Sequence, residues 1–367
     1  MAYIVEITDI PPERFDELAH QQTENGATSI TKIQQPNGLL TMRATYPGDD
    51  DEGGGNGQTA AGTSHGGVAG SGAAGGSSPS QASTGSLPGA FRGHGTFIYD
   101  TLATVADYGS VQNTVDAMQR AGMKHAWIRI HGTQAYGSST AAQIQELCDA
   151  MDAGGIAVAG WGWCQGANSA AEAKLAVKEL KRYGLSDYIA DIEHGTSNAQ
   201  WTVSEINDFC GRIRDAGLGS FAVSTYPLID WHNPDLMQAA QDHVDAFAPQ
   251  IYWFSFPNKK MVDQFQRPDG TKYRQNDASE YAKLCLDRWL KLMGPAPKPL
   301  ILTGQAYWGE GITQQGAEQK LDEFLSRWND YNRVAGVNWW HFGGHTGMSH
   351  AMLERIVSAN LGAKPYQ

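Results

Sequence analysis

The feature that most constrains the fold is an alternation of strand and helix patterns that recurs eight times between residues 93 and 367. Each unit begins with a short apolar run and continues into a segment with helical periodicity. Eight such units are the number in a (β/α)8 barrel, which needs about 250 residues. The predicted strands are 96–100, 126–130, 156–161, 188–193, 220–226, 246–253, 299–303 and 336–340.

The predicted helices are 110–120, 141–153, 170–182, 203–216, 234–243, 279–292, 316–329 and 349–359. A doubly wound parallel sheet is the alternative arrangement for such an alternation. The barrel is favoured because no glycine-rich phosphate loop follows the first strand. Polar residues also recur at most strand ends, where a barrel would carry its site.

Residues 1–47 are predicted to form a small α+β docking module with the order strand, helix, strand, strand. The strands fall at 3–7, 28–35 and 39–46, with Pro36-Asn37-Gly38 as the hairpin turn between the last two. Pro11 and Pro12 open the helix, which runs to about residue 23. A unit this small has a thin core, so we expect it to dock onto a partner or a larger assembly.

Residues 48–92 are dominated by glycine, serine, alanine, threonine and aspartate. A segment with so few large apolar side chains cannot build a core. It is predicted to be a flexible linker, which leaves residues 93–367 as the barrel domain.

The chain carries 27 basic and 39 acidic residues, a net charge of −12, which argues against nucleic acid or an anionic membrane as the main partner. No apolar run is long enough to span a bilayer. Residues 1–6 lack the pattern of a signal peptide, so we expect cytoplasmic synthesis and a particle-bound location or another export route. The four cysteines have no metal-binding spacing and are predicted to be reduced, mostly buried thiols.

The fourth predicted strand ends in two carboxylates, Asp191 and Glu193. Their separation of two residues places them on one side of the strand, with Cα atoms about 6.6 Å apart. Ile189 lies on that same side, one step deeper. Two carboxylates in unlike environments can divide into a proton donor and a partner that stays charged. Glu193 is the predicted general acid, and repulsion from Asp191 and Asp100 is expected to hold its proton.

Other strand ends carry aromatic and amide side chains that suit a sugar cleft. Aromatic faces stack on sugar rings, and the chain has 11 tryptophans and 14 tyrosines, although packing accounts for most of them. The predicted substrate-binding residues are Tyr252, Trp161, Trp163, Tyr226, Gln250 and Trp340.

Each of these assignments has a plainer alternative. Asp191 and Glu193 could be ion-pair partners of a residue such as Arg129, and Asp100 could cap the segment after it. Glu310, in the loop after the seventh strand, is expected to be solvated. His131, His194, His341 and His345 do not form a zinc-binding motif, so no metal is expected; His194 is expected to make hydrogen bonds within its loop.

The barrel region resembles the family 25 glycoside hydrolases, which are lysozyme-type muramidases, and more distantly the family 18 chitinases. The resemblance covers roughly residues 93–345 and rests on Asp100 at the end of the first strand and on Asp191-Ile192-Glu193. Of the longer family 18 motif D-x-x-D-x-D-x-E only the last D-x-E is present, because Ser186 and Ile189 occupy the upstream positions. Its M-x-Y-D motif is matched by Gln250-Ile251-Tyr252-Trp253, in which only the tyrosine is kept.

The resemblance implies hydrolysis of a β-1,4-linked polymer containing N-acetylhexosamine, most simply peptidoglycan, without a cofactor. Glu193 would protonate the glycosidic oxygen, and Asp191 would orient the substrate's acetamido group. The front module and the linker indicate an enzyme carried by an assembly such as a phage tail or an injection apparatus. The competing hypothesis is a non-catalytic barrel that binds glycans or forms part of a particle.

Overall fold

The computed structural model describes residues 3–10, 15, 19, 29–34, 40–46, 87–194, 201–231, 234–253, 257–308, 312–344, 347–359 and 361. The chain divides into two units, Met1–Ser80 and Gln81–Gln367. The predicted division at residue 47 is finer than this and stays a prediction.

The first unit contains a three-stranded antiparallel sheet in which β3 (Leu40–Tyr46) lies between β1 (Tyr3–Ile10) and β2 (Ser29–Gln34). All three predicted strands are therefore confirmed. Phe15 and Ala19 have helical backbone and pack against side chains of the sheet. The rest of the predicted helix and the 36–38 turn lie outside the described residues.

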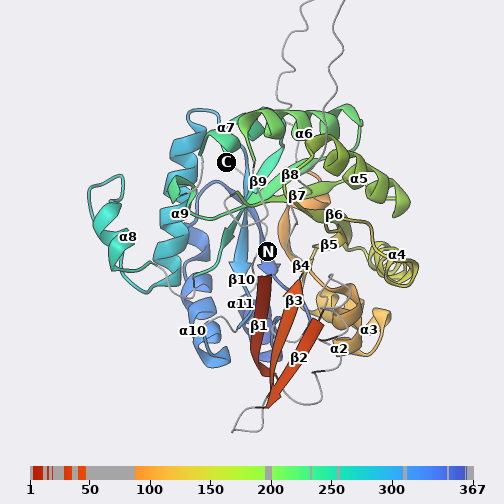
Figure 1. The fold of residues 1–367 in the computed structure, drawn as a ribbon. Helices are drawn as coiled ribbons and strands as arrows, with labels where there is room; N and C mark the ends of the chain where they lie inside the picture. Colours follow the sequence, from red (N-terminus) through yellow and green to blue (C-terminus); the bar gives the residue numbers. More distant parts are fainter. Residues whose placement is uncertain are drawn as a thin grey trace, which may run out of the picture. The chain divides into compact units, whose positions relative to one another are not determined.

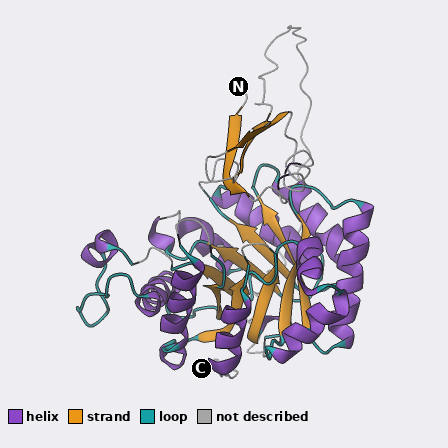
Figure 2. Ribbon diagram, turned by 90° about the horizontal axis from the view of Figure 1, so that it is seen from below, coloured by secondary structure: helices purple, strands orange, loops and turns teal. Residues whose placement is uncertain are grey.

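The second unit is a closed barrel of eight parallel strands, which confirms the predicted (β/α)8 fold. The sheet closes because β11 pairs with β4, with Gly336 opposite Gly93, a pairing that a doubly wound sheet lacks. Figure 2 shows the strands gathered inside the helices. In order around the barrel the strands are β4 (Gly93–Ile98), β5 (His125–His131), β6 (Ala157–Cys164), β7 (Tyr188–Ile192), β8 (Phe221–Thr225), β9 (Ala246–Ile251), β10 (Leu300–Gln305) and β11 (Val334–Trp340).

Helices follow each strand and surround the barrel (Figure 1). Local sequence sets their starts: Asn168 caps α5, and Thr202 with Glu205 forms a capping box on α6. All eight predicted helices are confirmed, whereas α2 and α8 were not predicted. The helices are α2 (Thr101–Tyr108), α3 (Val111–Arg120), α4 (Ser138–Ala153), α5 (Ser169–Arg182), α6 (Val203–Asp215), α7 (Pro234–Gln241), α8 (Lys259–Gln264), α9 (Ala278–Met293), α10 (Gln314–Leu325) and α11 (His350–Ala359), with the 3-10 turns η2 (Gly89–Phe91), η3 (Ile229–Trp231) and η4 (Trp328–Asp330).

The barrel strands separate an inner from an outer apolar layer. On β7, Ile189 belongs to the inner layer, whereas Tyr188, Ala190 and Ile192 belong to the outer layer beneath the helices. This alternation is the period-two pattern expected of a strand. Asp191 shares the side of Ile189, so it lies on the side of β7 that faces the barrel interior.

The amino-terminal end of the barrel is filled by η2, and we call this region the barrel base. Ala90 and Phe91 are buried in the inner layer, and the Trp127 indole donates a 2.7 Å hydrogen bond to the carbonyl of Ala90. The predicted linker 48–92 therefore extends too far, because its last residues supply packing that the sequence composition concealed.

The four cysteines are free and buried, as predicted. Among the residues that the structure describes, no helix combines the length and the apolar character needed to cross a bilayer.

Candidate functional site

The carboxyl ends of the eight strands form what we call the barrel mouth, where Asp191 lies on the interior side of β7. Asp191 is in register with Trp163 of β6 and Ser224 of β8. Only 7% of Asp191 is exposed, whereas Glu193, one step beyond the strand, is partly exposed. The two carboxyls therefore differ in depth, as the sequence pattern predicts.

Gln250 of β9, the second strand from β7 around the barrel, holds the deeper carboxyl. Its side-chain amide donates to Asp191 Oδ1 at 2.8 Å and lies 3.2 Å from Ser224 Oγ. Gln250 also lies near Glu193, where its side chain lowers the pKa of that carboxyl. Gln250 is itself only 7% exposed, and its hydrogen bond holds the Asp191 side chain in place. The predicted contact of Gln250 with substrate stays a prediction.

Burial is the main cause of the shifted titration of this pair. It raises the pKa of Asp191 well above its usual range, the charge of Glu193 raises it further, and Arg129 and Gln250 act in the opposite direction. Burial also raises the pKa of Glu193, and Gln250 opposes this. The expected cause for Glu193, repulsion from Asp191 and Asp100, is therefore replaced by burial, and the repulsion between the pair acts on the pKa of Asp191. The two carboxyls titrate as a pair. The pair gives up its last proton at a higher pH than a solvent-exposed carboxyl does.

Tyr226, just beyond β8, lies within electrostatic reach of both carboxyls. Burial, and then the charges of Glu193 and Asp191, raise the pKa of its phenol to about 12. The hydroxyl therefore stays protonated at neutral pH and can donate a hydrogen bond. Its position agrees with the predicted substrate contact, which remains to be tested.

One wall of the barrel mouth is aromatic. The Trp340 ring centroid lies 5.5 Å from that of Tyr99, 5.5 Å from that of Trp161 and 6.4 Å from that of Tyr252. Tyr99 is 40% exposed, and Trp340, Tyr252 and Trp163 are partly exposed. These side chains can offer ring faces to a sugar.

Trp161 has a different place from the one predicted. It is 1% exposed, and its indole nitrogen donates a 3.1 Å hydrogen bond to the carbonyl of Ile98. Its ring packs against Phe97 and Trp340. Trp161 therefore supports the exposed rings of the wall instead of presenting a free face to substrate.

Arg129 of β5 lies against this wall. Its guanidinium is 4.9 Å from the Tyr99 ring centroid and 5.3 Å from that of Trp161, both distances typical of cation–π contacts. Within the described parts of the chain it forms no ion pair with Asp191 or Glu193. The alternative in which the two carboxylates are ion-pair partners of Arg129 is therefore wrong.

Asp100 follows β4 and caps α2. Its side chain accepts a 2.9 Å hydrogen bond from the backbone N–H of Ala103, which is the alternative that the sequence left open. The capping bond engages Oδ1 and fixes the side chain at the start of the helix. A catalytic role for Asp100 stays a prediction that this bond does not support.

The histidines have structural positions. His131, predicted to face the site, is buried on the outer side of β5, where its Nε2 lies 2.9 Å from the Tyr188 hydroxyl and burial lowers its pKa to about 4. His194 accepts a hydrogen bond from the backbone of Trp201, as expected. His345 and Glu310 lie outside the described residues. Across the described ranges no histidine, cysteine and carboxylate group could hold a metal.

Tyr99, Ser224 and Tyr307 also lie at the barrel mouth, although they were not predicted to do so. Tyr307 contacts Tyr252 at a ring-centroid distance of 5.4 Å. A usable signal exists for Tyr99 and Ser224, because each continues the inward alternation set by Phe97 and Ala222. Tyr307 lies beyond the end of β10, where strand alternation no longer applies.

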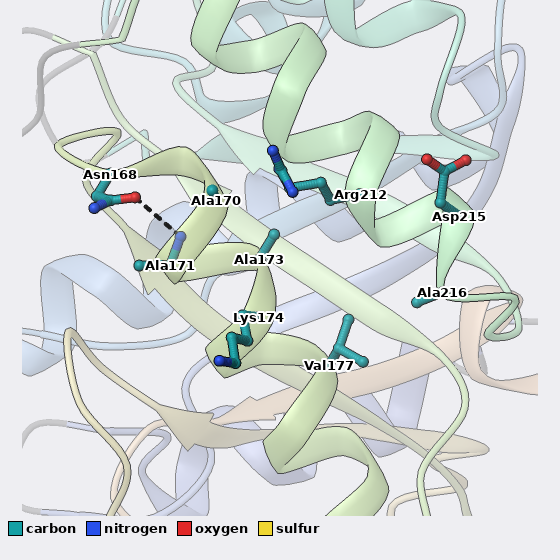
Figure 3. Close-up of a pocket in the computed structure, with 9 residues that line it drawn as sticks. All are labelled: Asn168, Ala170, Ala171, Ala173, Lys174, Val177, Arg212, Asp215 and Ala216. Atoms are coloured by element: carbon teal, nitrogen blue, oxygen red, sulfur yellow. Dashed lines mark hydrogen bonds between the residues drawn. The ribbon is translucent and has the colours of Figure 1, made fainter.

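A separate open groove of about 700 Å³ lies on the outside of the barrel, between α5 and α6 (Figure 3). Alanine side chains form much of its lining, and Arg212 at its rim is engaged by Asp208 at 3.0 Å. None of the residues of the barrel mouth lines it, so it contributes nothing to the carboxyl pair.

No family model matches the chain, and no curated protein matches it. Similar solved structures include the GH18 chitinase ChiB of Flavobacterium johnsoniae, which is 12% identical with a TM-score of 0.46 over 73% of this chain and 93% of that one. A class V chitinase of Pseudomonas fluorescens Pf-5 is 11% identical with a TM-score of 0.48 over 74% and 100%. The modular autolysin LytC of Streptococcus pneumoniae is 17% identical with a TM-score of 0.31 over 43% and 38%. Because each TM-score is below 0.5, function is inferred from the residues of the barrel mouth.

Proposed function

We propose that the barrel is a glycoside hydrolase that cleaves a polymer containing N-acetylhexosamine, with peptidoglycan as the substrate and a lysozyme-like muramidase activity. The observation that carries the proposal is the pair Asp191 and Glu193 at the barrel mouth, in which Gln250 holds the deeper Asp191 and burial raises both pKa values. A raised pKa on a partly exposed carboxyl beside aromatic faces is what a general acid for sugars needs. The family 25 resemblance stays a prediction.

In the proposed reaction Glu193 gives its proton to the glycosidic oxygen as the bond from that oxygen to the anomeric carbon breaks. The carbonyl oxygen of the substrate's acetamido group forms the new bond to the anomeric carbon. Asp191 accepts a hydrogen bond from the acetamido N–H, and this contact favours the ionised form of Asp191 and leaves the shared proton on Glu193. Water then attacks the anomeric carbon, the bond from that carbon to the acetamido oxygen breaks, and Glu193 takes a proton from the attacking water.

The test is turnover of purified peptidoglycan and of chitin by the wild-type protein and by Glu193→Gln. We expect Glu193→Gln to lose about 10²–10⁴-fold in rate, because general acid catalysis contributes that much. Glu146→Gln on the exposed side of α4 is the matched control and should keep full activity. Activity of Glu193→Gln within threefold of wild type would remove Glu193 from the mechanism.

A second candidate function, a non-catalytic barrel that binds glycans, is favoured by one observation. Trp253 stands where the family 18 motif M-x-Y-D has its aspartate, and it is fully buried with its ring stacked 4.6 Å from that of Phe324. This function predicts that the wild-type protein retains both polymers on a pull-down without releasing reducing ends from either.

We further propose that the first unit, Met1–Ser80, docks the enzyme onto an assembly such as a phage tail or an injection apparatus. This attachment would also determine where the enzyme is located. Within the described sheet of this unit, β1 and β2 are edge strands, and edge strands can pair with a partner's strand. Removal of residues 1–80 should leave turnover of glycan fragments unchanged and abolish co-purification with the parent particle. If the shortened protein still co-purifies, the barrel is the docking element and the structural alternative gains.

A further inference from the structure

The guanidinium of Arg129 is a cation at the barrel mouth that lacks an acidic partner. In the described portion of the chain it makes neither a hydrogen bond nor an ion pair, and its contacts are the two aromatic rings of Tyr99 and Trp161. Nε is enclosed without an acceptor, whereas the terminal nitrogens Nη1 and Nη2 are not enclosed. Two donors of the planar fork are therefore available to a ligand.

The position of the guanidinium is set by its surroundings. Trp161 is fully buried and Tyr99 is 40% exposed, so one ring supports the guanidinium from inside and the other reaches toward solvent. Gly132, just beyond β5, also lies close, because a methyl group added there would be 3.2 Å from Nη2. A side chain held in this way loses little freedom when it binds a ligand.

Among the described side chains, Arg129 has no ion-pair partner although it lies near the two carboxyls of the barrel mouth. Its positive charge lowers the pKa of Asp191, which places it within electrostatic reach of the carboxyl pair. Other arginines of the barrel unit, such as Arg212 and Arg288, have carboxylate partners at the surface. Arg129 instead keeps its fork free beside rings suited to sugars, and a free guanidinium fork matches the two oxygens of a carboxylate.

We infer that Arg129 binds a carboxylate carried by the glycan, and that the barrel mouth thereby selects carboxylate-bearing strands over uncharged N-acetylglucosamine chains. The inference rests on the proposed glycan substrate and names its class. Two sources supply such a carboxylate in peptidoglycan: the lactyl group of the sugar and the stem peptide attached to it. Chitin has neither.

The test measures equilibrium binding by calorimetry in the full-length Glu193→Gln protein, which avoids turnover. The probes are a hexasaccharide of alternating N-acetylglucosamine and N-acetylmuramic acid with free lactyl carboxylates, its methyl ester, the same strand bearing stem peptides, and chitohexaose. We expect a carboxylate-bearing strand to bind about 10- to 100-fold more tightly than the ester and chitohexaose, as hydrogen bonds to charged groups are worth that much. The tighter of the two acidic probes identifies the source of the carboxylate.

Three further substitutions in the same background locate the effect. Arg129→Gln should abolish the preference, and Gly132→Ala should weaken it while keeping the charge, since the added methyl group presses on Nη2. Arg212→Gln, which removes a surface arginine already paired with Asp208, is the control and should keep the preference.

Equal binding of the acid and the ester, binding of no probe, or an unchanged preference in both Arg129→Gln and Gly132→Ala would overturn the inference. These outcomes are separable from failure of the proposed hydrolysis. A wild-type protein that cleaves chitin and peptidoglycan without a carboxylate preference refutes only the role of Arg129. A protein that prefers the carboxylate strand and cleaves nothing refutes only the enzyme.

Discussion

The two ends of the barrel interior differ in the polarity of their inward side chains. At the barrel base, Ala90 and Phe91 close the interior with apolar groups, and one indole hydrogen bond from Trp127 fixes them. At the barrel mouth, Asp191 and Gln250 occupy equally inward positions and keep polar atoms away from water.

Along the same strands, inward residues at the base stabilise the fold, whereas inward residues at the mouth are suited to chemistry. On β7 the change takes one inward step, from Ile189 to Asp191. Burial of Ile189 stabilises the fold, whereas burial of Asp191 raises its pKa and opposes folding when the group is ionised. Substitutions at the base should therefore change stability alone, and substitutions at the mouth should change activity and stability in opposite directions.

The largest effect on stability is expected from Phe91→Ala at the barrel base. Phe91 is fully buried, and loss of a buried phenylalanine side chain costs about 3–5 kcal/mol in the free energy of unfolding. Urea unfolding measures it, with Val357→Ala on the exposed face of α11 as the control. Turnover per folded molecule should stay within twofold of wild type; a large loss of turnover would show that the base and the mouth are not separate.

Asp191→Asn should reduce turnover by about 10²–10³-fold, the range for removal of one group that stabilises charge in the transition state. The basic limb of the pH–rate profile should also move to lower pH. In the wild-type protein, the charge on one carboxyl raises the pKa at which the pair gives up its last proton. Asp191→Asn removes one of the two charges, so Glu193 should lose its proton at a lower pH. Residual activity with an unchanged basic limb would show that the two carboxyls are not coupled.

A smaller effect of opposite sign is expected on stability in the same variant. The folded-state pKa of Asp191 is raised, so the folded protein loses stability as pH rises from about 4, the unfolded pKa, through the folded pKa. Asp191→Asn removes this loss and should stabilise the protein at neutral pH by about 0.5–2 kcal/mol, with no gain at pH 4. Thermal unfolding at both pH values measures it.

The matched control for that measurement is Asp208→Asn. Asp208 is partly exposed and its pKa is lowered by the hydrogen bond with Arg212, so its removal should give no gain at neutral pH. A gain for Asp191→Asn that is the same at pH 4 and at pH 8 would rule out ionisation as its cause.

The sequence predicted the features that follow from short-range periodicity. Eight strand–helix units led to the barrel, and the two-residue spacing of Ile189 and Asp191 led to their shared side of β7. The amphipathic pattern in residues 170–182 likewise matched α5. Each of these depends on neighbours within about one turn of helix or a few residues of strand, which the sequence displays directly.

Features that depend on distant contacts were not predicted correctly. Phe91 lies in a glycine- and serine-rich setting that indicates a linker, and only its packing against β5 and β6 makes it part of the core. Trp161 was placed in contact with substrate because a strand end does not reveal which rings cover it. The helix α2 was missed because its eight residues give too short a periodic signal, although capping by Asp100 was left open as an alternative.

The pairing of β11 with β4 has a consequence for synthesis of the chain. The hydroxyl of Thr96 in β4 donates a hydrogen bond to the carbonyl of Trp339 in β11, 243 residues later in the chain. The pairing of these two strands, which we call the seam, therefore cannot form until β11 has left the ribosome. At translation rates of roughly 5–20 residues per second, the interval is about 10–50 s. During that time the nascent chain presents β4 as an open edge, and edges of this kind invite pairing with other chains. The seam thus makes the newly made protein most vulnerable to aggregation just before its final strand emerges.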